Sequence, residues 1–196
     1  MKKKQKPERK YTSSTVRLSD KHSWTAPDGY KLMVIDRGAA SFNIPGDWLI
    51  KKFEPLEIHD ADPPNDKARL MVTIWRFPPG IDWTGLPLAP MLMQAVAHDE
   101  KEDGEKRDLL QTGKIQSIMR PDLEVAWVQQ HFMDPVEKRE AISRIAIVRS
   151  PQVQLLVTLD YWPEDAKRCV PHWDELLRSL QTERVIKDPL KGPTLH

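Results

Sequence analysis

Short apolar runs, separated by residues that favour turns, fill the first part of the chain. Each run is long enough for a strand, too short for a typical helix, and bounded by glycine, proline or aspartate. The pattern therefore predicts four strands, at residues 31–36, 40–44, 48–53 and 56–60.

Pro45-Gly46-Asp47 separates the second of these runs from the third. Proline cannot donate a hydrogen bond to a strand ladder, glycine tolerates a positive φ, and aspartate caps turns. We expect the strand to stop and reverse here and Trp48 to return to the core.

A longer run at residues 68–77 is apolar on both of its alternating faces. Leu70, Val72 and Ile74 lie on one face, whereas Met71 and Trp75 lie on the other. Such a segment suits a central strand that is covered on both sides. We expect the tryptophans at periodic positions to be in the core, and these are Trp48, Trp75, Trp127 and Trp173.

Helical spacing follows in residues 89–99, which we predict to be a helix. The segment at 100–108 carries charges of both signs without periodicity and is predicted to be a loop. Four further strands are predicted, joined by short breaks that suit an antiparallel meander, at 112–120, 123–134, 141–150 and 152–161.

The strongest helical pattern lies near the carboxyl terminus. Its apolar stripe recurs at i, i+3, i+4 and i+7, and Pro163 with two acidic residues after it suits a helix start. Pro171 lies inside the pattern and is expected to kink or divide the helix near Val170. The stripe consists of Ala166, Cys169, Val170, Trp173, Leu176, Leu177 and Leu180. Together the predicted elements indicate an α+β fold, a twisted and mostly antiparallel sheet covered by helices.

The chain divides into a single predicted domain at 23–182, a flexible basic tail at 1–22 and a carboxyl-terminal tail at 183–196. Lys+Arg number 30 and Asp+Glu 29, so the net charge of +1 gives no global field toward nucleic acid or membrane. A charged contact must therefore be local. A phosphate or acidic surface could meet the basic tail, which otherwise acts as a solubilising segment, through Lys2, Lys3, Lys4, Lys6, Arg9 and Lys10.

The apolar stretches are shorter than the roughly 20 residues of a membrane-spanning helix, and the basic start is followed by polar residues rather than by a secretory apolar region. Cys169 is the only cysteine, so no intramolecular disulfide can form. These features favour a cytoplasmic protein.

Two motifs in this order of elements resemble a known superfamily. The first is Phe42 with Ile44-Pro45 and Trp48; the second consists of Pro171, Trp173, Leu176, Leu177, Ser179 and Leu180. With the elements between them, over residues 24 to 182, they resemble the α/β/α sandwich superfamily of PsbP, the DcrB-like lipoproteins and the Ran-binding guanine-nucleotide release factors. The resemblance implies the sandwich fold. It does not carry over an activity, because the lipoprotein cysteine and an acidic Ran-binding cluster have no counterpart here. Bacterial cytoplasmic chaperones of this fold are a further relative.

Candidate catalytic chemistry is sparse. His59, Asp60, Asp62 and Asp66 lie in one short segment and could hold a divalent cation for a hydrolase, but their spacing matches no EF-hand or zinc motif, and a loop capped by Asp side chains is the favoured explanation. Cys169 could act as a nucleophile with His131 or His172 as base, but it lies on the apolar helix stripe, where a thiol packs as a small hydrophobe. No phosphate-binding glycine motif and no nucleophile elbow occurs, so no metal, cofactor or catalytic residue is assigned.

Trp83 stands apart from the other tryptophans, in a loop between proline-rich breaks. Exposed together with Ile81 and Leu86, it would form a patch for a protein partner or for a second copy of the chain; packing over the sheet edge is the alternative. The leading hypothesis is a non-enzymatic binding, chaperone or adaptor module that engages a protein through residues 78–88 and the adjacent sheet. A metal-dependent hydrolase built on His59, Asp60 and Asp62, and a nucleic-acid accessory factor using the basic tail, remain alternatives.

Overall fold

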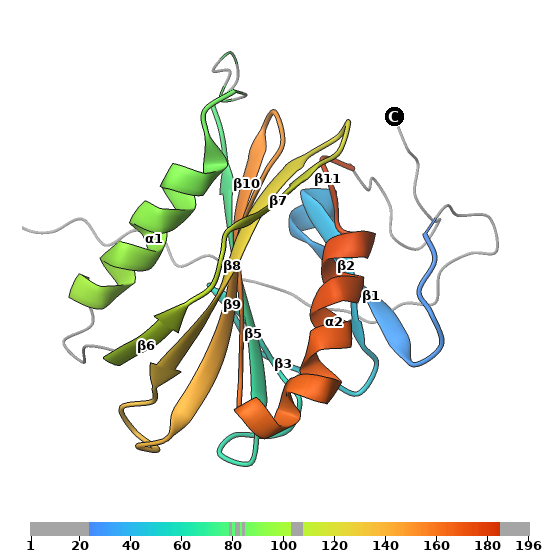
Figure 1. Cartoon of the computed structure of the whole chain (residues 1–196). Helices are drawn as coiled ribbons and strands as arrows, with labels where there is room; N and C mark the ends of the chain where they lie inside the picture. Colours follow the sequence, from blue (N-terminus) through green and yellow to red (C-terminus); the bar gives the residue numbers. More distant parts are fainter. Residues whose placement is uncertain (1–23, 79, 81–82, 84, 103–107, 185–196) are drawn as a thin grey trace, which may run out of the picture.

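The computed structural model describes residues 24–78, 80, 83, 85–102 and 108–184 of the 196-residue chain. It contains a larger sheet of eight strands and a smaller sheet of three, and the strand pairs are antiparallel. The larger sheet has the order β3-β4-β5-β10-β9-β8-β6, and β7 also pairs with β8. The predicted α+β class, with an antiparallel sheet flanked by helices, is confirmed (Figure 1).

The bounds of the elements follow the predicted runs closely. The smaller sheet contains β1 (Tyr30–Ile35), β2 (Ala40–Pro45) and β11 (Gln181–Thr182). The larger sheet contains β3 (Leu49–Phe53), β4 (Leu56–His59), β5 (Ala68–Arg76), β6 (Asp108–Thr112), β7 (Gln116–Met119), β8 (Glu124–Met133), β9 (Glu140–Arg149) and β10 (Val153–Tyr161). The helices are α1 (Leu88–Glu102) and α2 (Ala166–Ser179), with short 3-10 turns at Asp36–Gly38 and Pro163–Asp165. Neither α1 nor α2 is long and apolar enough to cross a membrane.

Opposite faces of the larger sheet carry different covers (Figure 1). One face packs against α2 and the smaller sheet and forms the main core, around fully buried residues such as Phe42, Leu155 and Trp173. The other face packs against α1 through a second cluster that includes Leu92, Val128 and other apolar residues of β8 and β9. The sheet is therefore the middle layer of a sandwich.

The two sheets are joined at the carboxyl-terminal end of the described chain. β11 pairs with β2, and the N–H of Glu183 donates to the carbonyl of Ala39 at 3.1 Å. The carboxylate of Glu183 accepts hydrogen bonds from Ser150 Oγ at 2.7 Å and from the N–H of Gln152 at 2.6 Å. Glu183 thus bonds both to the smaller sheet and to the β9–β10 turn of the larger one. The basic segment predicted at 1–22 lies outside the described residues.

The break at Pro45-Gly46-Asp47 does more than end a strand. β2 belongs to the smaller sheet and β3 to the larger one, so the chain passes from one sheet to the other here, through a turn in which the N–H of Trp48 donates to the carbonyl of Pro45 at 3.3 Å. Gly46 has no positive φ; a Cβ there would lie 3.2 Å from the carbonyl oxygen of Gly29, whose group accepts the Gly46 N–H. Close backbone approach therefore favours glycine. Trp48 is buried, as predicted.

Three predictions need correction. The loop predicted at 100–108 is wrong at both ends, because α1 continues to Glu102 and β6 begins at Asp108, and no element was predicted for residues 109–111 of β6. The strand predicted at 112–120 is shorter, since residue 112 ends β6 and β7 covers only 116–119. Pro171 does not divide α2, because burial of Cys169, Trp173 and two leucines on one face stabilises the helix across the missing hydrogen bond.

Trp173 and Trp75 form a matched pair for testing the core. Trp173 is fully buried and packs edge-on against Trp127 at a ring-centroid distance of 5.8 Å, whereas Trp75 is 44% exposed. We expect Trp173→Ala to lower the free energy of unfolding by about 3–5 kcal/mol because it leaves a cavity. Trp75→Ala should lower it by about 1 kcal/mol or less. Urea unfolding followed by circular dichroism measures both, and equal losses would contradict the assignment of the core.

Candidate functional site

Helix α1 covers only part of its face of the larger sheet. Every residue of β9 after its first is buried, because α1 lies on one side and the main core on the other. On the next strand, β10, burial alternates residue by residue, and the side chains on the α1 side are only half-buried. No helix among the described residues covers this part of the sheet. We call it the open face, and its residues are Met71, Thr73 and Trp75 of β5 and Gln154 and Thr158 of β10, whereas Leu156 of β10 packs against the α1 cluster. Gln154 Oε1 and Thr158 Oγ1 are themselves buried.

Aromatic side chains gather where β5 leaves the sheet. Trp75 is 44% exposed, so the prediction that it lies in the core is wrong: it falls on the face of β5 that α1 does not reach. Phe77 follows two residues later and stacks on Trp83, with ring centroids 5.1 Å apart and planes inclined by 26°. Trp83 is half-buried by this contact, Leu86 is 45% exposed, and Ile81 lies outside the described residues.

A buried arginine fixes the loop that carries these groups. Arg149 of β9 is 2% exposed, and its guanidinium donates to Glu124 Oε2 at 2.6 Å and to the carbonyl of Leu86. Removing either partner would leave a buried charge without compensation, which is costly. The sequence offered one signal for this role, a second arginine at the end of the apolar run of β9, and our sequence reasoning did not use it.

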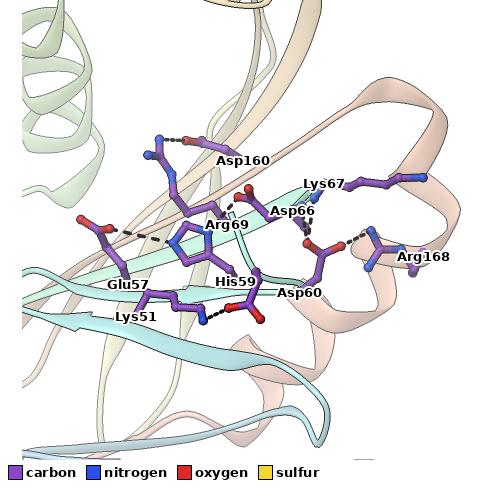
Figure 2. A network of polar contacts seen from close by, with 11 residues as sticks. Lys51, Glu57, His59, Asp60, Asp66, Lys67, Arg69, Asp160 and Arg168 are labelled. Atoms are coloured by element: carbon purple, nitrogen blue, oxygen red, sulfur yellow. Dashed lines mark hydrogen bonds and ion pairs between the residues drawn. The ribbon is translucent and has the colours of Figure 1, made fainter. Parts of the chain in front are cut away.

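At the opposite end of the open face, polar residues occupy one row across four strands. His59, Arg69, Asp160 and Ser143 are register neighbours on β4, β5, β10 and β9. Asp160 accepts from Arg69 Nη2 at 3.1 Å (Figure 2) and also from Ser143 Oγ at 2.6 Å. His59 is buried, with its Nδ1 2.8 Å from Asp66 Oδ2. The row is therefore a set of mutually paired groups.

The predicted metal-binding segment is held by protein partners (Figure 2). Asp60 accepts from the backbone N–H groups of Lys67 and Ala68 at 2.8 and 3.0 Å and from Arg168 at 2.7 Å. Asp62 pairs with Lys51, and His59 with Asp66. The structure thus gives His59, Asp60 and Asp62 three different partners, and the described residues contain no group of three or more His, Cys, Asp or Glu arranged for a metal ion.

The pKa of Asp60 follows from these contacts. Burial alone would raise it, but the two backbone N–H groups and the guanidinium of Arg168 favour the charged carboxylate and hold the pKa below its usual value. The interaction links the loop after β4 to α2, which is far away in the sequence. Asp60 is consequently a structural anchor for the start of α2.

The structure does not pair the candidate nucleophile with a histidine. Cys169 is fully buried, and burial raises the pKa of its thiol to about 11. His131 Nδ1 lies 2.6 Å from Glu140 Oε1, and His172 Nδ1 lies 2.7 Å from the hydroxyl of Tyr30. Burial also lowers the pKa of His172. These contacts hold the histidines in place without activating the thiol.

The two motifs that carried the resemblance meet at one small pocket. It lies between β2 and α2, and its size suits a single water molecule rather than a substrate. Asn43 Oδ1 and Trp173 Nε1 are buried there without a protein partner among the described residues. The pocket is lined by Asn43, Ile44, Pro45, Trp48, Leu70, Leu159, His172, Trp173 and Leu176.

Replacement of Asp60 by asparagine tests the anchor. The folded pKa lies below the unfolded value of about 3.9, so its stabilisation is complete above that value and is lost as the pH falls through the folded pKa. At pH 7 we expect Asp60→Asn to lower the free energy of unfolding by about 1–3 kcal/mol. At about pH 2.5 the difference in the free energy of unfolding between Asp60→Asn and the natural chain should become smaller. Asp62→Asn, at a side chain that is 74% exposed, is the control and should cost about 0.5 kcal/mol or less at pH 7. If this difference in the free energy of unfolding became larger in acid, the result would contradict the role of Asp60 as an anchor.

Thiol reactivity tests the state of Cys169. A buried thiol with a pKa of about 11 supplies little thiolate at pH 8, so a disulfide reagent should react at least about 100-fold more slowly with the folded chain than with the urea-unfolded chain. The absorbance of the released thiolate measures both rates. Equal rates would show an accessible, ionised thiol and would revive the nucleophile hypothesis.

Comparison with solved structures places the fold among PsbP-like proteins. Cyanobacterial PsbP (CyanoP) from Synechocystis sp. PCC 6803 superposes with a TM-score of 0.53 at 12% identity, over 79% of this chain and 93% of that one. LpqN of Mycobacterium tuberculosis, described as involved in cell envelope biogenesis, gives a TM-score of 0.52 at 12% identity, over 78% and 89%. At these identities the likeness concerns the fold alone, and it confirms the resemblance inferred from the two motifs.

Sequence comparison gives a nearer relationship. A protein of Nostoc sp. (strain PCC 7120), described as uncharacterized protein alr1449, is 39% identical over 197 residues, which cover 98% of this chain and 97% of the relative. The Alr1449 family matches residues 31–186, from β1 through the end of the described chain. The chain, with its PsbP-like fold, therefore belongs to the Alr1449 family.

Proposed function

We propose that the chain is a protein-binding module, of the adaptor or chaperone kind, and that the open face with its aromatic end is the binding surface. The single observation that carries the proposal is the 44% exposure of Trp75 on a central strand, next to the Phe77–Trp83 stack. Trp75 lies at the end of this strand, and exposed apolar area of this kind commonly marks an interface.

The composition of the open face suits a protein partner. Met71 and Trp75 offer apolar area, and tryptophan is enriched among the residues that dominate binding energy. The charged row at the other end of the face supplies a polar rim that would orient the partner. Within this row the side chain of Arg69 is 38% exposed. Arg149 bonds to the carbonyl of Leu86, so Leu86 is already held in place before binding.

Binding is favoured over catalysis because the titratable groups beside the open face bond one another. Asp160 is taken by Arg69 and Ser143, and His59 lies against Asp66. A general base or nucleophile would need a free, activated group facing the substrate. The free, buried thiol of Cys169 is compatible with a reducing compartment, and we propose that the protein is located in the cytoplasm.

Photo-crosslinking tests the proposal. Trp75 is replaced by p-benzoylphenylalanine, and Val136, which is 76% exposed in the β8–β9 turn, is replaced in the same way as the matched control. In cells of the source organism we expect a discrete adduct from position 75 that is absent from position 136. Mass spectrometry then identifies the protein, which is purified for binding measurements.

Affinity measurements decide whether the adduct reports a specific interface. Trp75→Ala and Leu86→Ala should each weaken binding of the purified partner by about tenfold or more, without changing the unfolding midpoint by more than a few degrees. An adduct of the chain with itself would assign the open face to self-association. Identical adducts from both positions, or unchanged affinity in both variants, would refute the proposal.

A further inference from the structure

The strands β6 and β7 together form one exposed edge of the larger sheet. Both pair with the same side of β8, β6 along its second half and β7 along its first. Every described residue of the two strands is exposed. Of the nine large hydrophobic side chains that are exposed among the described residues, four lie on this short edge, namely Leu109, Leu110, Ile118 and Met119.

Exposed apolar edges are uncommon in monomeric proteins because an unpaired strand is a template for another strand. Natural edges are usually protected by charges, prolines or a covering helix. Here the two strands present apolar side chains and, among the described residues, pair with no strand other than β8. Lys114, exposed in the segment between them, is a charge inside this edge, and β6 carries a bulge at Leu110 between Leu109 and Gln111. The edge therefore has the properties of an interface.

The partners on β8 give the position of each residue along this edge. Leu109 pairs with Phe132 and Met119 pairs with Glu124, so they lie equally far on either side of Val128. Consider a twofold axis that is normal to the sheet and passes through the edge beside Val128. This axis places β6 of one copy antiparallel to β7 of the second copy. That operation brings Leu109 opposite Met119 of the second copy, on the same face of the sheet.

The same axis pairs opposite charges. Asp108 is the partner of Met133, and the N–H of Arg120 bonds to the carbonyl of Leu123, which again places the midpoint at Val128. Asp108 thus comes opposite Arg120 of the second copy, and symmetry makes each contact twice. A shift of one residue would put facing side chains on opposite faces, and a shift of two would set Asp108 against Ile118. The register centred on Val128 matches Leu109 to Met119 and Asp108 to Arg120, and it sets Gln111 opposite Ile118.

We infer that two copies of the chain associate through the β6–β7 edge, forming a dimer in which the eight-stranded sheet continues across a twofold axis. The pairs that specify the register are Leu109 with Met119 and Asp108 with Arg120 of the second copy. Within one chain Arg120 bonds to Asp122, and it would bridge both carboxylates in the dimer. The inference is independent of the proposed function, because the open face lies on β5 and β10, away from this edge.

Sedimentation of the full chain across a range of concentrations tests the dimer. We expect a species of twice the mass of one chain, and Leu109→Lys should weaken its association by about tenfold or more. Leu49→Lys is the matched control, because Leu49 is a similarly exposed leucine, 37% against 42%, on β3 at the other edge of the same sheet. It should leave the association unchanged. A chain that stays monomeric at every concentration, or a dimer broken only by the control, would overturn the inference.

Charge reversal tests the register. Asp108→Arg and Arg120→Asp should each weaken self-association. In the homodimer of either variant, both contacts between positions 108 and 120 join two groups of the same charge. Mixed in equal amounts, the two variants should form a heterodimer, since both cross-axis pairs become opposite in charge again. The double variant should likewise recover the dimer. Because Arg120→Asp also removes the bond to Asp122 and the mixture does not restore that bond, recovery identifies the intermolecular pair. Failure of both recoveries would refute this register.

Discussion

The strict alternation of side chains along β10 and its neighbours is the constraint on which the rest of the structure depends. In an antiparallel sheet each residue faces the opposite side from the one before, so the sequence of β5, β9 and β10 decides what each layer can bury. One side is apolar, apart from Arg144 of β9, which pairs with Asp174 of α2, and it seals against α2 and the smaller sheet. The other side is apolar only beneath α1, and where α1 ends it becomes mixed. A site can exist on this sheet because one helix covers only half of a face.

Much of the fold could be predicted from the sequence because its signals are local. Turn residues bounded the strands from β1 to β5, and the stripe through Cys169 and Trp173 located α2. The assignment of β2 and β3 to separate sheets could not be predicted, since strand pairing is a long-range property and Pro45-Gly46 would serve a hairpin or a crossing equally well. β6 was missed because its exposed residues lack the alternation that burial imposes.

The candidate site was predicted only in part. Loop residues 78–88 and the adjacent sheet were expected to form a binding surface, and in the structure Phe77 stacks on Trp83 while Trp75, two residues before Phe77, is exposed. The exposure of Trp75 could not be predicted, because periodicity shows which residues share a face but not how far a helix extends over it. The row from His59 to Ser143 was equally invisible, since its members are scattered over four strands and meet only through register.

The bonds of Glu183 bear on how the protein reaches its native state. The ribosome synthesises β1 and β2 early. The third strand of their sheet, β11, and the Glu183 carboxylate that bonds to the β9–β10 turn are synthesised more than a hundred residues later. Until then β2 keeps an unpaired edge, and the main core lacks the helix that closes it. Assembly is therefore dominated by contacts between distant parts of the chain, which slows folding and leaves strands exposed during synthesis. A nascent chain of this kind has the most to gain from chaperones at the ribosome.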